Sequence, residues 1–136
     1  QNRASVGGEM IVSLPFPAPE LFPNRKNGKH WTTTSKAKQS AREWAEKASK
    51  QAQGVFIPGG GTLPLSIVFV APDGRHRDLD NCLAAAKPQI DGIADALGVN
   101  DRRFRPILVD YIRGDAPGAM IVAVGVRIET MQVMTE

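Results

Sequence analysis

The sequence predicts a single small domain of the α/β (α+β) class, in which two main helices pack on one mixed β-sheet. The chain has 136 residues, 42% of them hydrophobic, and a domain typically uses about 100–200 residues. Apolar runs of strand length alternate with two longer segments whose apolar side chains recur at helical spacing. This alternation gives the order β-α-β-α-β-β, with the strands in one sheet. We expect residues 1–8 to be a flexible N-terminal segment and residues 9–136 to form the domain.

The first part of the chain predicts a strand, a loop and a helix. Residues 10–16 (MIVSLPF) are apolar and lead into proline-rich sequence, which is typical of a strand. Residues 17–33 contain three prolines and an Asn-Gly turn, which indicate a loop. A helix follows, and Thr34 or Ser35 is expected to cap it, because a hydroxyl can accept a hydrogen bond from a free backbone amide.

That first helix is expected to run to about Ala52. Small and apolar side chains recur along it at Ala37, Ala41, Trp44, Ala45 and Ala48. We expect Trp44 to be a core residue of this helix. In the second helix, nothing near Cys82 would activate its thiol, so we expect a small buried hydrophobic side chain there.

The second part predicts a strand, a helix and two further strands. Residues 63–71 (LPLSIVFVA) are too apolar for a strand with both faces in water. Residues 81–97 are helical in pattern, with a break expected at Lys87-Pro88 because proline disfavours helical geometry in the residue before it. Gly98 is expected to end this helix. Residues 106–112 and 120–128 complete the sheet.

Composition excludes several classes of protein. The single cysteine cannot form an internal disulfide, and no Cys/His spacing indicates a zinc site. No apolar run approaches the roughly 18 residues that a membrane span needs, and the chain does not open on an apolar signal region. We therefore expect a cytoplasmic protein with no membrane partner.

The distribution of charge indicates a polyanionic partner. The net charge is +3, and the region 25–50 has eight Lys or Arg residues against two Glu. Further basic residues form two clusters, at 75–77 and at 102–105, and carboxylates lie between these two clusters. A basic surface around an acidic pocket suits a protein that carries out metal chemistry on a polyanion. The alternative is that these charges only solvate a surface.

Asp78 and Asp80 are the first candidate metal ligands. In an extended chain, side chains two residues apart project to the same side, so both carboxylates can face one point. Mg²⁺ prefers carboxylate oxygens, usually one or two from protein together with waters and a substrate phosphate. Asp91, Asp95 or Asp101 could add a further carboxylate.

Each of these residues also has a purely structural interpretation. Asp80 or Asn81 could cap the second helix. Lys87 lies four residues before Asp91, so the two could form an ion pair across one helical turn. The functional interpretation of Lys87 is a cation that stabilises the negative charge building on a phosphate in the transition state.

The motif at 75–81 (RHRDLDN) is followed by Lys87, Asp91 and the pair Asn100-Asp101, and this order resembles the signature of the RusA-like Holliday-junction resolvases. The opening segment 13–19 (SLPFPAP), with Asn24-Arg25 after it, is similar to the first strand and loop of that family. The resemblance spans roughly residues 10–128. It departs from the family at Asn100, where the family usually has an aspartate, and at Lys87, which lies nearly a helical turn later.

The resemblance implies a RusA-like fold and a small homodimeric nuclease of phage or prophage origin acting in DNA recombination and repair. Such enzymes depend on Mg²⁺, for which Mn²⁺ is a possible substitute, need no organic cofactor, and resolve four-way DNA junctions by paired nicks. The residues it assigns to catalysis are Asp78, Asp80, Lys87 and Asp101. The first two aspartates and Asp101 would also be the metal ligands. The residues expected to contact DNA are Asn24, Arg25, Lys26, Lys29, Arg75, Arg77, Asn81, Arg102 and Arg103.

Two other hypotheses remain at this stage. A non-catalytic branched-DNA-binding module could have kept the fold and the basic surface, and the two departures from the family pattern favour it. A metal-dependent hydrolase of small phosphate esters would need a closed pocket, whereas basic residues spread along the chain favour a long polymer.

Overall fold

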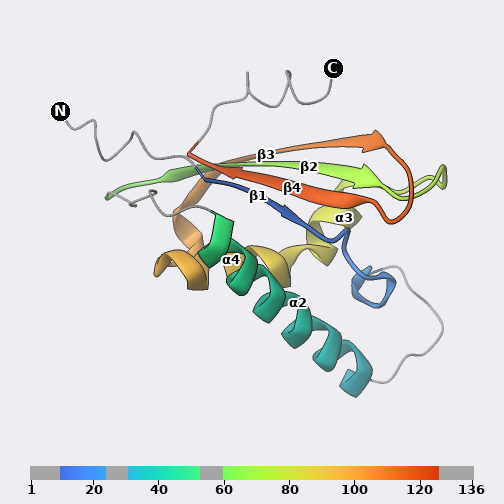
Figure 1. The fold of residues 1–136 in the computed structure, drawn as a ribbon, viewed down its shortest axis with the longest axis horizontal. Helices are drawn as coiled ribbons and strands as arrows, with labels where there is room; N and C mark the ends of the chain where they lie inside the picture. The colour runs from blue at the N-terminus through green and yellow to red at the C-terminus, as the bar shows by residue number, and fades with distance from the viewer. Residues whose placement is uncertain (1–9, 24–30, 53–59, 126–136) are drawn as a thin grey trace.

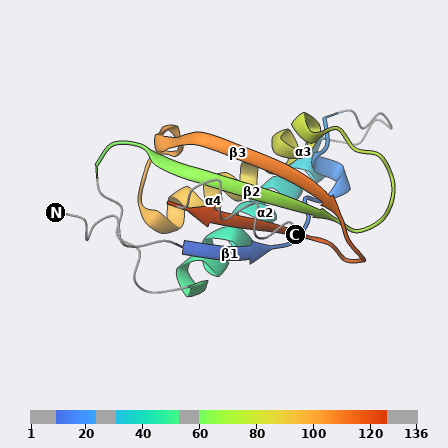
Figure 2. The same ribbon diagram turned by 90° about the horizontal axis from the view of Figure 1, so that it is seen from above.

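Four strands form one mixed sheet in the computed structural model, which describes residues 10–23, 31–52 and 60–125. The strands are β1 (Met10–Leu14), β2 (Leu63–Ala71), β3 (Phe104–Arg113) and β4 (Ala119–Val124). Their order across the sheet is β1-β4-β2-β3 (Figure 2). Strand β4 is antiparallel to both of its neighbours, and β2 is parallel to β3. The prediction of a mixed sheet is therefore confirmed.

The helices α2 (Trp31–Ala52), α3 (Leu79–Ala85) and α4 (Lys87–Leu97) all cover the same face of this sheet (Figure 1). Two short 3-10 helices complete the described part of the chain: η1 (Pro19–Leu21) follows β1, and η2 (Asp101–Arg103) precedes β3. Because β2 and β3 are parallel, the chain must cross over between them, and α3 and α4 form that crossover. This connection brings the start of α3 to the end of β2, where the predicted site lies.

The core lies between the sheet and the helices. Strand β1 illustrates the alternation, because Met10, Val12 and Leu14 are buried while Ile11 and Ser13 are exposed. Strands β2 and β4 bury their side chains more continuously. Cys82 is fully buried, as predicted, and burial raises the pKa of its thiol.

Helices α2 and α4 pack closely because a glycine lies at their contact. A Cβ atom on Gly92 would lie 2.2 Å from the carbonyl oxygen of Arg42 and 2.8 Å from the Cβ atom of Ala45. Ala45 is fully buried there. Trp44 is next to it, about 100° further round the helix, and is 60% exposed. The prediction that Trp44 is a core residue is wrong, because the small side chains of α2 face α4 instead.

The predicted break in the second helical segment is confirmed. Helix α3 ends at Ala85 and α4 begins at Lys87, with Pro88 in its first turn. Gly98 ends α4 in the left-handed conformation, with φ of 70°. The cap position of α3, however, is Asp78 rather than Asp80 or Asn81.

The start of α2 also differs from its prediction. The helix begins at Trp31 rather than after Thr34 or Ser35. Residues 32–35 all carry hydroxyl groups that could cap a helix, so side-chain chemistry does not distinguish among them. The predicted flexible segment 1–8 and residues 126–128 of the last predicted strand lie outside the described residues. None of the described helices is long and apolar enough to cross a membrane.

Candidate functional site

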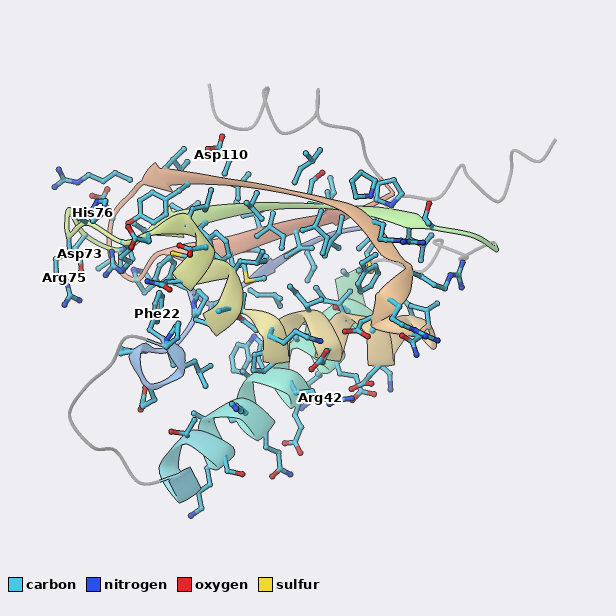
Figure 3. The ribbon with its side chains drawn as sticks, turned by 180° about the vertical axis from the view of Figure 1, so that it is seen from behind. Phe22, Arg42, Asp73, Arg75, His76 and Asp110 are labelled. Atoms are coloured by element: carbon cyan, nitrogen blue, oxygen red, sulfur yellow. The ribbon has the colours of Figure 1, made fainter. Side chains whose placement is uncertain are left out.

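The loop between β2 and α3 carries the charged motif of the sequence. Figure 3 shows Asp73, Arg75 and His76 gathered where this loop leaves the sheet. Strand β2 is buried along most of its length and therefore holds the start of the loop rigidly. The loop then turns into α3, whose first turn contains Asp80.

A cavity of about 520 Å³ joins three of the four residues predicted to be catalytic. Asp80 contributes to it from α3, Lys87 from the start of α4, and Asp101 from η2. The remaining walls are formed by apolar side chains and the small Ala84, and they include Ile107 of β3. The fold therefore places these three charged residues around one solvent-accessible hollow beside the edge strand β3.

Within this hollow, the ammonium group of Lys87 is paired with two carboxylates. Its Nζ atom lies 2.5 Å from Oδ1 of Asp91 and also donates a hydrogen bond to Oδ2 of Asp101. Burial lowers the pKa of Lys87, but the hydrogen bonds to Asp101 and Asp91 outweigh this effect and raise the pKa above its usual value. The hydrogen bond from Lys87 in turn lowers the pKa of Asp101. Lys87 is therefore a permanent cation at neutral pH.

Asp78 lies at the cap position of α3 and lines a neighbouring cleft together with Asn81. Its Oδ1 atom is 3.0 Å from Nε2 of His76. The first turn of α3 thus separates the cleft lined by Asp78 from the cavity lined by Asp80 and Asp101. Among the residues described, no three His, Cys, Asp or Glu side chains form a group able to hold a metal ion.

The donor chemistry of the cavity nevertheless suits Mg²⁺. Asp80 and Asp101 both present carboxylate oxygens to the same hollow, and Mg²⁺ is commonly held by one or two carboxylates while waters and substrate phosphates complete its shell. Two protein carboxylates are therefore sufficient for this mode of binding.

Two of the arginines predicted to bind DNA differ sharply in accessibility. The side chain of Arg75 is 78% exposed, whereas that of Arg77 is only 13% exposed. The guanidinium of Arg77 forms an ion pair with Asp73 at 3.0 Å and donates a hydrogen bond to the hydroxyl of Tyr111 at 3.3 Å. Arg75 is therefore largely exposed, with its Nη2 atom 3.4 Å from Oδ2 of Asp73, whereas the nearly buried Arg77 holds the loop in place.

A second basic group surrounds η2, where Arg102, Arg103 and Arg105 line a shallow groove. Asn100 caps η2, because its Oδ1 atom accepts a hydrogen bond of 2.9 Å from the backbone amide of Arg102. This explains how asparagine serves at a position where the resemblance leads one to expect aspartate. The predicted DNA contacts Asn24, Arg25, Lys26 and Lys29 lie outside the described residues.

Two of the residues that fix Arg77 come from other elements of the fold. Tyr111 reaches it from β3, and Phe16 lies under its guanidinium with the ring centroid 5.1 Å from Cζ. Neither long-range contact has a sequence signal. Asp73, which also fixes Arg77, does have a sequence signal, because Asp-Gly commonly forms a turn. Its Oδ1 atom does accept a hydrogen bond of 3.0 Å from the backbone amide of Arg75.

An uncharacterized protein of Xylella fastidiosa (strain Temecula1 / ATCC 700964) is 44% identical over 114 residues, which cover 81% of this chain and 73% of that protein. No family model matches the chain. Identity at this level over most of both chains implies a common fold and descent. The chain belongs to the same family as this Xylella fastidiosa protein.

Proposed function

We propose that the chain is a Mg²⁺-dependent, structure-selective endodeoxyribonuclease that resolves four-way DNA junctions by paired nicks in recombination and repair. The observation that carries this proposal is the shared cavity of Asp80, Lys87 and Asp101. These residues lie on three separate elements, α3, α4 and η2, yet they meet around one hollow and match, in order, the residues that the resemblance assigns to catalysis.

The chemistry proposed for the hollow is hydrolysis of a phosphodiester. Asp80 and Asp101 would hold the metal ion, whereas Asp78 lines the neighbouring cleft and is paired with His76. When bound, Mg²⁺ lowers the pKa of a water molecule and neutralises charge on the phosphate. Lys87 would donate hydrogen bonds to a phosphate oxygen and stabilise the charge that builds there. Because its pKa is raised, it acts as a cation and not as a base.

The basic residues around the hollow support a long polyanion as substrate. Arg75 is exposed beyond the end of β2, and Arg102 is exposed on η2 next to Asp101. Contacts of this kind orient a nucleic acid through its phosphates without reading its bases. A homodimer would supply two hollows related by a twofold axis, which matches the near symmetry of a four-way junction.

A non-catalytic module for branched DNA is the second candidate function. It is favoured by the pairing of Asp101 with Lys87, which leaves this carboxylate already neutralised by a cation of the protein itself. Such a module would keep the basic surface and the junction affinity but would cut no strand.

The Asp80→Asn variant tests the proposed function against this alternative. The variant should bind a four-way junction as tightly as the wild type and should not nick it, because the amide keeps the size of the side chain but loses a charged ligand. Glu43→Gln is the matched control, since this exposed residue on α2 loses the same charge and lines neither the hollow nor the cleft beside Asp78. Unchanged nicking by Asp80→Asn would contradict the proposal.

A further inference from the structure

A cleft of about 380 Å³ opens beside Asp78, on the side of α3 away from the catalytic hollow. One side of the cleft is aromatic and proline-rich, formed by residues after β1 that include Phe16, Pro17 and Phe22. The other side comes from the loop after β2 and the start of α3, and it is polar. A concave site that combines an apolar wall with a few polar groups is typical of binding sites for planar organic groups.

The aromatic wall is built rigidly. The rings of Phe16 and Phe22 are stacked, with centroids 6.2 Å apart and planes 23° apart. Phe16 also meets the fully buried Phe69 edge to face, with centroids 6.3 Å apart. Phe22 is only partly buried, and Figure 3 shows it on the same side of the molecule as Arg75 and His76.

Arg77 holds this wall in place from behind. Its guanidinium lies over the Phe16 ring, 5.1 Å from the centroid, and the ion pair with Asp73 fixes the guanidinium in turn. The same hydrogen bonding from Arg77 is the main cause that lowers the pKa of Asp73 to about 2. Arg77 is therefore a positioning residue for the cleft, because it fixes the Phe16 ring on which Phe22 is stacked.

The polar side of the cleft carries hydrogen-bonding side chains, of which Arg75 is paired with Asp73 at 3.4 Å and His76 with Asp78 at 3.0 Å. The side-chain amide of Asn81 makes no hydrogen bond to any of the residues that the structure describes, and it can both donate and accept. The side chains of Arg75 and His76 at the rim are 78% and 89% exposed. The cleft thus presents an aromatic surface, an amide and a cation, which match the face, the edge and the phosphate of one nucleotide.

We propose that this cleft binds one unstacked nucleobase of the DNA, adjacent to the phosphate that enters the hollow of Asp80 and Asp101. The inference rests on the proposed function and extends it to the recognition of a single base. The base would stack on Phe22, and Asn81 would hydrogen-bond to its edge. Base stacking is interrupted at a branch point, so unstacking a base there costs less than within a continuous duplex. The cleft would then give nicking a preference for certain bases at the crossover.

Fluorescence of 2-aminopurine, placed in turn at each position around the crossover of a synthetic four-way junction, tests the proposal. The measurement is made with the full chain in EDTA, so that no strand is cut, and junction affinity is measured in parallel by gel shift. We expect the fluorescence to change at one or two positions on binding. Phe22→Ala should abolish this change and weaken junction binding roughly tenfold, as expected for loss of one base–aromatic stack.

Two control variants and a measurement of folding distinguish loss of the base site from a general effect on the protein. Phe22→Tyr should restore the fluorescence change, because it keeps the ring. Trp44→Ala removes an aromatic side chain that is 60% exposed on α2 and does not line the cleft, so it should leave the change intact. Circular dichroism shows whether Phe22→Ala is folded. If it is not folded, Asn81→Ala provides the test, because loss of the hydrogen bond to the base edge should reduce the fluorescence change.

Four results would overturn the proposal. Tight junction binding with unchanged fluorescence at every position would refute the base site while leaving the proposed function standing. An unchanged signal with folded Phe22→Ala would do the same. Absence of any junction binding would refute the proposed function and the base site together. Saturable binding of a free deoxynucleotide without a signal in the junction would assign the cleft to a free ligand instead, and so would also contradict the proposal.

Discussion

The ammonium group of Lys87 donates a hydrogen bond to the carboxylate of Asp101, which lies fourteen residues further along the chain. This contact joins the first turn of α4 to η2 and closes one side of the hollow that also contains Asp80. It therefore places a fixed cation beside both carboxylates that are proposed to hold a metal ion. The pKa values of Lys87 and Asp101 each depend on the hydrogen bond between them, so removing one of these charges should shift the pKa of the other.

Lys87→Met should slow nicking of a four-way junction by roughly 10²–10³, as expected when one preorganised donor to the transition state is removed. Junction binding should change little, because most of the affinity comes from basic residues elsewhere. Single-turnover cleavage and gel shift measure the two effects separately. Lys47→Met removes an exposed charge of the same type from α2 and should nick at the wild-type rate. Equal rates for the two variants would exclude a catalytic role for Lys87.

Lys87→Met should also change the pKa of Asp101 in the protein without DNA. Hydrogen bonding from Lys87 lowers the pKa of Asp101, so Lys87→Met should raise this pKa toward the usual value for an aspartate. NMR titration of the Asp101 carboxyl carbon checks the shift. A pKa that stays low in the variant would show that something other than Lys87 stabilises the carboxylate.

The ionisation of Asp73 should make the thermal stability of the protein depend on pH. Hydrogen bonds from Arg77 and then from the backbone amide of Arg75 lower its pKa from an ordinary 3.8 to about 2. Because the pKa in the folded state is below that of the unfolded chain, the stabilisation is complete above about pH 4 and is lost as the pH falls toward about 2. The wild type should melt above Asp73→Asn at about pH 6, and the difference should vanish near pH 2. A difference that is independent of pH would contradict this assignment.

Gly92 is predicted to be irreplaceable at the contact of α2 with α4. A methyl group would lie 2.2 Å from the carbonyl oxygen of Arg42, and the backbone must move to relieve that overlap. Gly92→Ala should therefore destabilise the fold by about 1–3 kcal/mol or more in urea unfolding, although alanine is the better helix former. Gly60→Ala, where nothing lies within 4 Å of the added Cβ, is the control and should be nearly neutral. An unfolding free energy for Gly92→Ala equal to the wild type would disprove the close packing.

Arg75 and Arg77 should respond differently to substitution although they are two residues apart. Arg75→Ala should lower the slope of log affinity against log salt by about 1, the effect of losing one phosphate contact. Arg77→Ala should mainly lower the melting temperature, because its guanidinium is nearly buried and holds Asp73. Junction affinities over a range of salt, with thermal melts of both variants, distinguish the roles. A reduced salt slope for Arg77→Ala in a fully stable protein would reverse the assignment.

Much of the fold could be predicted because its signals are local. The strand at Leu63–Ala71, the helix break before Pro88 and the helix end at Gly98 all follow from residue type, and the structure confirms each of them. Trp44 could not be placed in this way. Both faces of α2 contain small residues, and the choice between them depends on Gly92, about fifty residues away, which allows α4 to approach at Ala45.

The candidate site was predictable in its parts but not in its arrangement. Spacing alone suggested that Asp78 and Asp80 face one point, as side chains do in an extended chain. Helix α3 begins between them, at Leu79, and directs the two carboxylates into different hollows. The ion pair of Lys87 with Asp91 was expected from helical spacing, whereas its contact with Asp101 depends on the turn at the end of α4.

The proposed junction cleavage is tested with a synthetic four-way junction, labelled on each strand in turn and compared with a linear duplex of the same sequence. The reaction is followed with Mg²⁺ and with EDTA. Paired nicks at the crossover that require Mg²⁺ and are absent from the duplex are the result predicted for a junction resolvase. Tight binding of the junction without any cut, in Mg²⁺ or in Mn²⁺, would contradict the claim and leave the non-catalytic DNA-binding module as the function of the chain.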